Sequence, residues 1–215
     1  MNAIRLCFIR HGETAWNAER RIQGQLDEPL SAVGHAQARA VANGLSRESI
    51  SKEPIAAIYA SDLSRALHTA EAAAHLLKLP IRRCTDLRER HYGVFQRLTY
   101  EEVRERYPGE YARFLAREAD FALPGGGESL RQFSARVIRG VDEIVAAHPG
   151  GLVLVFTHGG VLDILHRRAS GKPLSAPRDF EIPNAGLNWF EVAAGEWSIL
   201  SWAERVHLAE ALDEL

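Results

Sequence analysis

The chain contains little of what marks an exported, membrane-bound or nucleic-acid-binding protein. Its 215 residues include only two cysteines, Cys7 and Cys84, and carry a formal net charge of −2. Both cysteines stand in apolar, strand-like surroundings, so we expect reduced packing residues and not a disulfide framework. The near-neutral charge creates no overall field that would attract nucleic acid or an anionic membrane.

Long hydrophobic runs are also missing. No apolar stretch approaches the roughly 20 residues that a membrane-spanning helix requires, and the first residues lack the pattern of a signal peptide. We therefore expect a cytoplasmic protein that binds neither membrane nor nucleic acid; whether it forms a homodimer is left open. With 46% hydrophobic residues the chain can bury a sizeable core, and its length fits a single domain spanning 1–215.

What the sequence does contain is an alternation of strand-like and helix-like segments. Strands are predicted over residues 3–9, 55–60, 81–84, 152–157, 186–193 and 197–202. Apolar residues at helical spacing predict helices over 31–46, 63–77 and 129–147. This order predicts a doubly wound α/β fold, in which a mostly parallel sheet carries helices on both faces. The last two strands flank Gly195 and are expected to form a hairpin, which can supply an antiparallel edge.

The region 86–127 is the least regular part of the chain. It contains Pro108 and three consecutive glycines at 125–127. We expect it to be a lid-like insertion that folds over the ligand crevice, and not a separate domain. Capping boxes, in which two side chains satisfy the first turn of a helix, are predicted at 99–102 and 129–132.

Two of the predicted strands end in the same way. Each apolar run stops at a histidine followed by glycine: His11 and Gly12 after the run 4–9, His158 and Gly159 after the run 152–156. The carboxyl ends of parallel strands open onto one ligand crevice, so the two histidines are expected to face each other across a pocket. A single Arg-His pair could merely solvate a strand end, but two such junctions are hard to explain by packing.

Four motifs resemble a known family. They are residues 10–14, 61–66, 87–93 and 157–159, with Asn17 following the first. In this order they resemble the histidine phosphatase superfamily, which includes phosphoglycerate mutases and acid-type phosphatases. Each motif alone is weak, but four in the family's order are specific, and they run from the first strand to about Gly160. The resemblance implies a phosphoglycerate mutase-like fold and a phosphatase that acts on a small phosphorylated metabolite.

The chemistry of phosphate ester hydrolysis fits these residues. The reaction needs a nucleophile, positive charge over the phosphoryl oxygens and a proton for the leaving group. A neutral imidazole is a competent nucleophile near pH 7, and a phosphohistidine intermediate divides the reaction into two easier steps. His11 is the expected nucleophile, with its other ring nitrogen donating to a backbone carbonyl. Arg10, Arg65 and His158 are expected to surround the phosphate.

Glu89 is the proton donor that the family resemblance implies. From the residues alone, an ion pair between Glu89 and its neighbours Arg88 and Arg90 would be the favoured interpretation. If 87–91 is extended, however, successive side chains alternate in direction and the two arginines point away from the carboxyl. A bound phosphate beside Glu89 would favour its protonated form.

Further substrate contacts are implied more weakly. The predicted substrate-binding residues are Asn17, Gln23, Gly24, Arg90, Tyr92, Thr157 and Gly159. Asn17, Gln23 and Gly24 could equally be turn residues. Specificity is expected to come from 90–128, whose aromatic side chains offer surface for the rest of the substrate: Tyr92, Phe95, Tyr107, Tyr111 and Phe114.

Two other phosphatase chemistries fit the residues poorly. Cys84 and Arg90 have the spacing of cysteine-based phosphatases, but the residues between them include two carboxylates and no glycine, which would repel phosphate. A metal site is not expected, because His11 and His158 lack the carboxylates or close histidine spacing of metal ligands. We therefore expect neither a metal ion nor a cofactor.

Two alternative functions stay open. A phosphoglycerate mutase would share every catalytic group, and the stretch 89–93 is mutase-like. The segment 99–129, however, is short and lacks the paired arginines and lysine with which mutases hold a carboxylate. A non-catalytic binding module on this fold is the other alternative. Such a module would be expected to have lost His11, Arg65 or Glu89, and all three are present.

Overall fold

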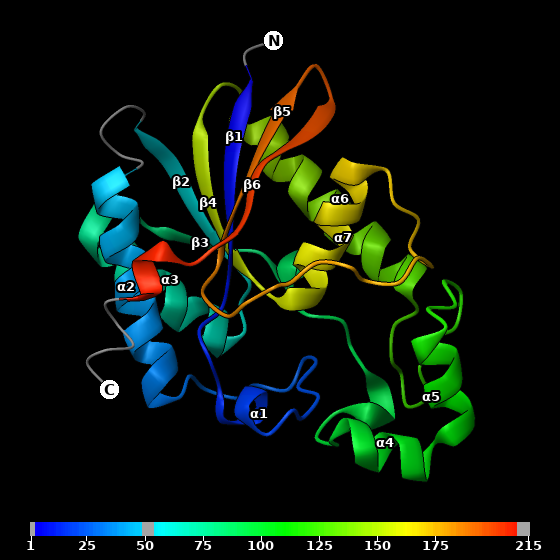
Figure 1. Ribbon diagram of the computed structural model, residues 1–215. Coiled ribbons are helices and arrows are strands. Elements are labelled where there is room, and N and C mark those ends of the chain that lie inside the picture. The colour runs from blue at the N-terminus through cyan, green and yellow to red at the C-terminus, as the bar shows by residue number, and fades with distance from the viewer. Residues whose placement is uncertain (1–2, 49–53, 210–215) are drawn as a thin grey trace.

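A mixed sheet forms the centre of the computed structural model, which describes residues 3–48 and 54–209. Its six strands lie in the order β3-β2-β4-β1-β5-β6 (Figure 1). They are β1 (Ile4–Arg10), β2 (Ile55–Ala60), β3 (Ile81–Arg83), β4 (Leu152–Thr157), β5 (Leu187–Ala193) and β6 (Glu196–Glu204). The first four in sequence pair in parallel, and β5 and β6 add an antiparallel hairpin at one edge. The predicted fold class and the hairpin are both confirmed.

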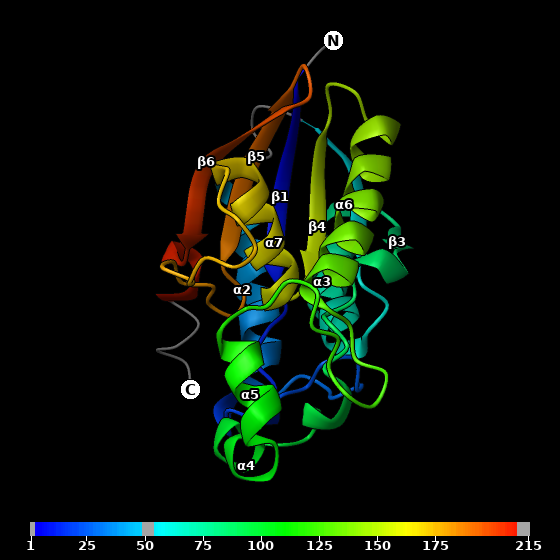
Figure 2. The same ribbon diagram turned by 90° about the vertical axis from the view of Figure 1, so that its right-hand side faces the viewer.

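Four long helices cover the two faces of the sheet. α2 (Ala32–Glu48) and α3 (Ser64–Leu77) lie on one face, and α6 (Leu130–Ala147) and α7 (Gly159–Ser170) lie on the other (Figures 1 and 2). Each face has its own hydrophobic cluster. The central strands β1 and β4 are therefore covered on both sides, which explains why their sequences are continuously apolar and not alternating.

The segment between β3 and α6 is more regular than the sequence predicts. It contains two short 3-10 helices, η1 (Thr85–Leu87) and η2 (Gly93–Phe95), followed by α4 (Tyr100–Arg106) and α5 (Pro108–Leu115). The expectation of irregular structure was wrong for the residues that form α4 and α5. Both helices are short, and they meet at Tyr107, which ends α4 and precedes the proline that opens α5. The predicted capping boxes at Thr99 and Ser129 are present.

This segment has a small core of its own. Ile22, Phe95, Val103 and Leu123 are buried together, and aromatic side chains pack around them. Phe95 is fully buried, so the prediction that it offers surface to a substrate was wrong. Figure 2 shows α4 and α5 below the end of the sheet. The lid-like nature of the insertion stays a prediction.

The cysteines and the helix lengths can be compared with the expectations directly. Cys7 lies in one face's hydrophobic cluster and Cys84 packs against the other's, both as free thiols. Their prediction as packing residues is confirmed.

No helix within 3–48 and 54–209 is long and apolar enough to cross a membrane. The remaining short elements are α1 (Ala15–Ala18) and η3 (Val206–Leu208).

Candidate active site

The candidate site lies where three parallel strands end, at the lower edge of the sheet in Figure 1. Arg10, the last residue of β1, is opposite Thr157, the last residue of β4. The next residue of each strand is a histidine, so the register alone brings His11 beside His158. Their ring centroids are 5.2 Å apart. The predicted pairing of the two histidines is confirmed.

His11 is held in one tautomer. Its Nδ1 lies 2.7 Å from the carbonyl oxygen of Gly12, and because a carbonyl can only accept, Nδ1 must carry the proton. The Nε2 atom is therefore the unprotonated nitrogen. Burial, followed by the charges of Arg65 and Arg10, lowers the pKa of His11 well below its usual value. The imidazole is consequently neutral at physiological pH, which is the state a nucleophile needs.

Gly12 brings the chain close to helix α2. A Cβ at this position would lie 2.5 Å from the carbonyl oxygen of Gly34, closer than real contacts allow. The Gly12 N–H donates to the hydroxyl of Thr69 on α3 at 3.0 Å. The carbonyl of His11 accepts from Asn184 at 3.0 Å. The nucleophile's backbone is thus fixed from three sides.

Arg10 and Arg65 bring buried positive charge without a counter-ion. Arg10 Nη1 donates to the Ile182 carbonyl at 2.6 Å, and Arg65 donates to the carbonyls of Leu26 and Gly24 at 2.8 and 2.7 Å. Neither arginine forms an ion pair with a carboxylate in the described ranges. Burial lowers the pKa of Arg65 to about 10 and also lowers that of Arg10. Arg65 therefore stays protonated near neutrality, as does Arg10, because arginine begins from a very high pKa.

His158 is the N-cap residue of α7, directly before its first turn, and is fully buried. Its Nε2 lies 2.8 Å from the hydroxyl of Ser61, which follows β2. Burial, together with the charges of Arg65, His11 and Arg10, lowers its pKa well below the usual value. A second neutral imidazole therefore borders the site. The positive end of the α7 helix dipole also lies beside the site and favours an anion there.

Several buried polar atoms of the site have no hydrogen-bond partner among the described residues. They are Arg10 Nε, Arg65 Nε, His158 Nδ1 and Gln23 Oε1. Buried polar groups in folded proteins nearly always have partners. Two guanidinium N–H groups left over beside neutral histidines are what a site for a bound oxyanion requires.

Glu89 completes the site from the segment after β3. Its carboxylate accepts from the backbone N–H of Arg90 at 2.7 Å and of Gly160, in the first turn of α7, at 2.9 Å. Burial lowers the pKa of Arg10 and of Arg65, and the negative charge of Glu89 opposes this lowering. A Cβ at Gly160 would lie 2.1 Å from the Glu89 carboxylate, so only glycine lets this carboxylate reach the helix.

The neighbours of Glu89 point elsewhere, as the alternation predicts. Arg88 pairs with Asp62, and Arg90 donates twice to the Glu128 carbonyl, at 2.9 and 2.7 Å. The alternative interpretation, an ion pair of Glu89 with these arginines, was therefore wrong. Arg90 also takes no part in a cysteine-type phosphate loop, which agrees with the rejection of that chemistry.

Arg136 on α6 was not predicted as a site residue, yet it holds the Glu89 segment. Its guanidinium donates to the carbonyls of Asp86, Arg88 and Glu89 at 2.9, 3.0 and 3.3 Å. It also forms a two-fold pair with the Glu128 carboxylate at 2.8 and 2.7 Å. The sequence offers no signal for this role, because α6 lies 40 residues or more along the chain from η1 and meets it only in the fold.

The weaker substrate-binding predictions meet different surroundings. Gly24, at φ +59°, offers its carbonyl to Arg65, and Gln23 is buried with its Oε1 unpartnered in the described chain. Asn17 forms the capping box of α1 with Thr14. The Thr157 hydroxyl donates to the Leu87 carbonyl at 2.9 Å, which commits it to holding η1.

The last two of these predicted residues lie against arginines. The Arg10 side chain lies 3.5 Å from where a Cβ at Gly159 would be, and the Arg90 guanidinium lies 5.7 Å from the Tyr92 ring centroid. Substrate contact by this set, Asn17, Gln23, Gly24, Arg90, Tyr92, Thr157 and Gly159, stays a prediction. No three His, Cys, Asp or Glu side chains in the described part of the chain are grouped to hold a metal ion.

Known proteins resemble this chain along nearly its whole length. The sequence profile of the histidine phosphatase superfamily (branch 1) matches residues 6–205. Phosphoglycerate mutase-like protein 4 of Arabidopsis thaliana is 42% identical over 207 residues, covering 95% of this chain and 87% of that protein. The metal-independent phosphoserine phosphatase of Arabidopsis thaliana is 38% identical over 205 residues, covering 95% and 83%. The solved structure of a mycobacterial glucosyl-3-phosphoglycerate phosphatase matches with a TM-score of 0.82 and 33% identity, covering 95% of this chain and 100% of that one.

Proposed function

The chain belongs to the histidine phosphatase superfamily, and from this premise we propose that it hydrolyses small phosphate monoesters through a phosphohistidine on His11. The observation that carries the proposal is the state of His11: a neutral ring with Nδ1 bonded to the Gly12 carbonyl, beside two arginines that donate to backbone carbonyls and form no ion pair within the described ranges. Positive charge from arginine takes the place that a metal ion has in other phosphatases, so no metal is needed.

The first half of the reaction transfers the phosphoryl group to the enzyme. Arg10, Arg65 and the α7 N-terminus neutralise the phosphoryl oxygens. The lone pair of His11 Nε2 attacks phosphorus, a P–N bond forms and the ester P–O bond breaks. The negative charge of the bound phosphate favours the protonated form of Glu89, which gives its proton to the departing alkoxide. The positive charge that develops on the ring is stabilised by the Gly12 carbonyl, which accepts from Nδ1.

The second half returns the enzyme to its starting state. Glu89, now a carboxylate, takes a proton from a water molecule as that water attacks the phosphorus. The P–N bond breaks, inorganic phosphate leaves and His11 is neutral again. The overall change is one ester and one water converted to one alcohol and one phosphate.

Release of inorganic phosphate from a panel of phosphomonoesters tests this proposal. The panel contains p-nitrophenyl phosphate, O-phosphoserine, 3-phosphoglycerate and glycerol 3-phosphate, each assayed with and without a chelator. We expect turnover that survives the chelator and is lost in His11→Ala. Turnover that needs an added divalent cation would contradict the proposal.

A phosphoglycerate mutase is the second candidate function. Residues 89–93 are mutase-like, and one relative is named phosphoglycerate mutase-like. A mutase must exclude water while its substrate reorients in the site. The segment 99–129 is short, which favours hydrolysis instead. Interconversion of 2- and 3-phosphoglycerate that is stimulated by the bisphosphate and outpaces phosphate release would establish the mutase. A cytoplasmic location and the absence of nucleic acid or membrane partners stay predictions, and the question of a homodimer stays open.

A further inference from the structure

A cluster of arginines beside the site shares a single carboxylate. Asp163 on α7, whose side chain is 4% exposed, accepts from Arg117 Nη2 at 2.6 Å, Arg167 Nε at 3.0 Å and Arg178 Nε at 3.1 Å. Burial alone would raise the pKa of Asp163, but the Arg167 hydrogen bond and the neighbouring charges hold it below the usual value. The carboxylate is therefore ionised, and the cluster keeps an excess of positive charge.

Arg178 is the member of this cluster with donors to spare. Arg167 also donates to the Pro173 carbonyl and Arg117 to the Leu174 carbonyl, each at 2.7 Å. Arg178 is bonded only through Nε within the described ranges, and its side chain is 46% exposed. Both of its Nη atoms are left to form the planar two-donor fork that suits a carboxylate.

The loop that carries Arg178 is held firmly on both sides. Lys172 pairs with Asp179 at 2.6 Å, and the Phe180 ring stacks on His166 with 3.7 Å between centroids. The Trp202 indole donates to the Glu181 carbonyl at 2.7 Å. Arg178 thus stands in a fixed place, so that less order must be imposed when a ligand binds.

The same loop reaches the phosphate site. The carbonyl of Ile182, four residues after Arg178, accepts from Arg10 Nη1 at 2.6 Å. The positive charge of Arg178 contributes to the lowered pKa of Arg10. Burial raises the pKa of Tyr100, and the charge of Arg178 is the strongest effect that lowers it. It acts on Tyr92 as well. The positive charge of Arg178 therefore acts on three groups near the site: Arg10, Tyr92 and Tyr100.

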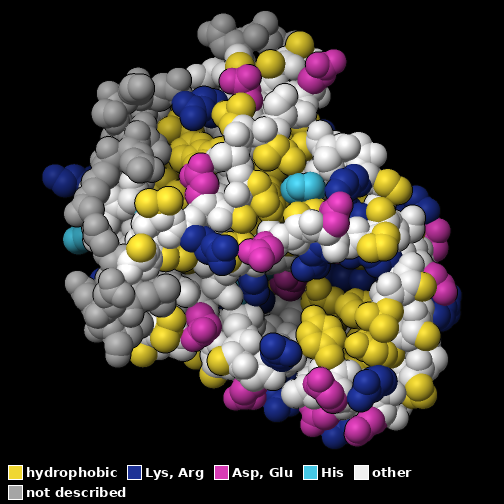
Figure 3. Space-filling view, viewed as in Figure 1, with side chains coloured by type: hydrophobic (Ala, Val, Ile, Leu, Met, Phe, Trp, Pro, Cys, Tyr) yellow, Lys and Arg dark blue, Asp and Glu magenta, His cyan; other side chains and the backbone are white. Residues whose placement is uncertain are grey.

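Figure 3 shows a hollow between the lower end of the sheet, where the strands of the candidate site end, and α4–α5. Lys and Arg side chains lie along its upper rim, below the loop that follows α7, and hydrophobic side chains cover the opposite wall. A substrate whose phosphate occupies the site can extend its remaining atoms into this hollow, with an arginine rim on one side.

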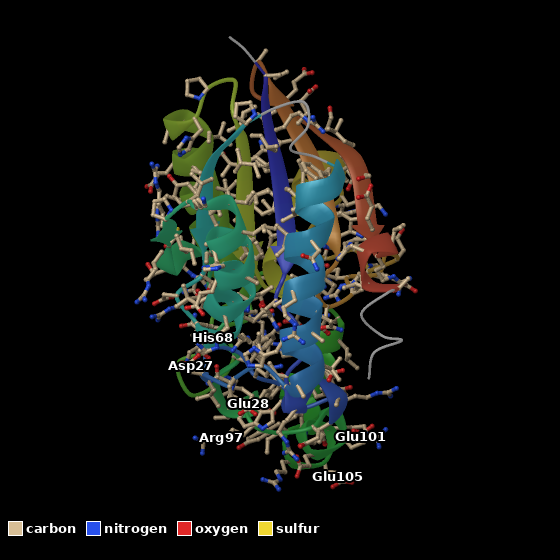
Figure 4. All side chains as sticks on the ribbon, turned by 90° about the vertical axis from the view of Figure 1, so that its left-hand side faces the viewer. Asp27, Glu28, His68, Arg97, Glu101 and Glu105 are labelled. Atoms are coloured by element: carbon tan, nitrogen blue, oxygen red, sulfur yellow. The ribbon has the colours of Figure 1, made fainter. Side chains whose placement is uncertain are left out.

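The other flank of the site is acidic. Asp27 and Glu28 lie beyond the lower end of α3, where Figure 4 labels them, and their charges act on Arg65. Asp27 accepts from the backbone N–H of Ser64 at 2.7 Å, at the start of that helix. These carboxylates repel a second negative group, so an anionic extension of the substrate is favoured on the side of Arg178.

We propose that Arg178 binds a carboxylate in the substrate, beyond the phosphate, and so gives the enzyme a preference for phosphomonoesters of small carboxylic acids. This inference rests on the proposed function, because it takes the phosphate to lie against Arg10 and Arg65. It assigns specificity to a residue outside 90–128, the region from which we expect specificity on sequence grounds.

Matched pairs of esters test the assignment. O-phosphoserine is compared with O-phosphoethanolamine, and 3-phosphoglycerate with glycerol 3-phosphate, since each pair differs chiefly by a carboxylate. In Arg178→Gln we expect kcat/KM to fall about 10- to 100-fold for the carboxylated member, the equivalent of one charged hydrogen bond or pair. The non-carboxylated member and p-nitrophenyl phosphate should change less than about twofold by the same reasoning, since neither presents the group Arg178 binds.

Arg205→Gln is the control variant, because Arg205 pairs with Glu181 of the same loop at 3.3 Å. It should leave both members of each pair unchanged. Equal losses on both members in Arg178→Gln would overturn the inference and indicate a structural role. Hydrolysis by the wild type without preference for the carboxylated member would overturn it while the proposed function stands.

Binding measurements keep the two proposals separate. If no ester is hydrolysed, the proposed function fails, and calorimetry with 3-phosphoglycerate and glycerol 3-phosphate still decides the role of Arg178. Tighter binding of 3-phosphoglycerate that is lost in Arg178→Gln would support the inference. Equal affinities of the wild type for the two esters would overturn it.

Discussion

At the residue scale, the role of each site residue follows from whether its side chain is charged. Arg10 and Arg65 donate to backbone carbonyls and so keep their full positive charge for a ligand. His11 and His158 are held neutral by burial and by those arginines. A carboxylate, Glu89, stands at the edge of the same pocket on two backbone N–H groups.

Replacing Glu89 should affect the leaving group and not binding. In Glu89→Gln, kcat for alkyl phosphates should fall about 10²- to 10⁴-fold, the usual effect of removing a general acid. The loss should be much smaller for p-nitrophenyl phosphate, whose leaving group needs little protonation. Glu105→Gln, at an exposed position of α4, is the control. Equal losses on both kinds of ester would show that Glu89 is not the acid.

The neutral histidines also predict how stability depends on pH. Their pKa values are lowered in the folded protein from the usual 6.5. Below about pH 6.5 the unfolded chain binds protons that the folded chain does not, so the free energy of unfolding should fall as pH falls. The loss should reach at most about 1.4 kcal/mol per pH unit for each histidine, and should level off only below the folded pKa values.

Urea unfolding between pH 7.5 and 5 measures this dependence. His11→Ala should show a shallower fall in unfolding free energy than the wild type, because one proton-linked group is gone. The exposed His75 offers a control, and His75→Ala should keep the wild-type slope. An unchanged slope in His11→Ala would mean that His11 is not held neutral in the folded protein.

At the scale of elements, the site depends on a segment with little regular structure. Residues 88–92 carry Glu89 between η1 and η2, and Arg136 of α6 binds the carbonyls of Arg88 and Glu89 there and of Asp86 in η1. Arg136→Lys keeps the charge and loses the fork, so Glu89 should be less well positioned. We expect a larger loss of kcat on alkyl phosphates than on p-nitrophenyl phosphate.

Arg139 gives a matched control on the same helix. It pairs with Asp86 at the surface and does not bind the backbone of Glu89. Arg139→Lys should leave both rates close to wild type. If Arg136→Lys lowered the two rates by one common factor, its role would be structural and not the positioning of the acid.

How far the sequence predicts these elements depends on their length and their patterning. β2 and β4 are predicted to the residue, and the helices α3 and α6 to within one, because a buried strand or a long amphipathic helix imposes a strong pattern. Only the start of α4 was predicted, by the capping box at Thr99, and α5 was missed, because seven or eight residues give too few turns for a periodic signal. Their packing against Phe95 stabilises them, and that contact is tertiary.

From the residues alone, the site was predictable only where it follows directly from strand ends, whereas Glu89 was predicted from the family resemblance. His11 and His158 each come one residue after a buried strand, so parallel pairing brings them together. Arg136, Arg178 and Asn184 belong to a helix and a loop that approach the site only after the chain has folded around the sheet. No local spacing in the sequence connects them to the strand ends.

At the scale of the whole molecule, one sheet edge collects every proposed function. Helices on both faces bury the sheet, so that the carboxyl ends of β1, β2 and β4 are the natural place for a ligand. The insertion 86–127 and the loop after α7 border this edge from two sides (Figures 1 and 3). In the proposed function, the sheet edge holds the phosphate and the surrounding loops contact the rest of the substrate.

Trapping the phosphorylated enzyme tests the central claim most directly. The protein is mixed with a ³²P-labelled phosphomonoester, stopped within the first turnovers in alkaline denaturant, and digested to locate the label. The account predicts acid-labile phosphate on Nε2 of His11, absent from His11→Ala and present in His75→Ala. Equal labelling of the wild type and His11→Ala, or turnover by His11→Ala at the wild-type rate, would contradict it.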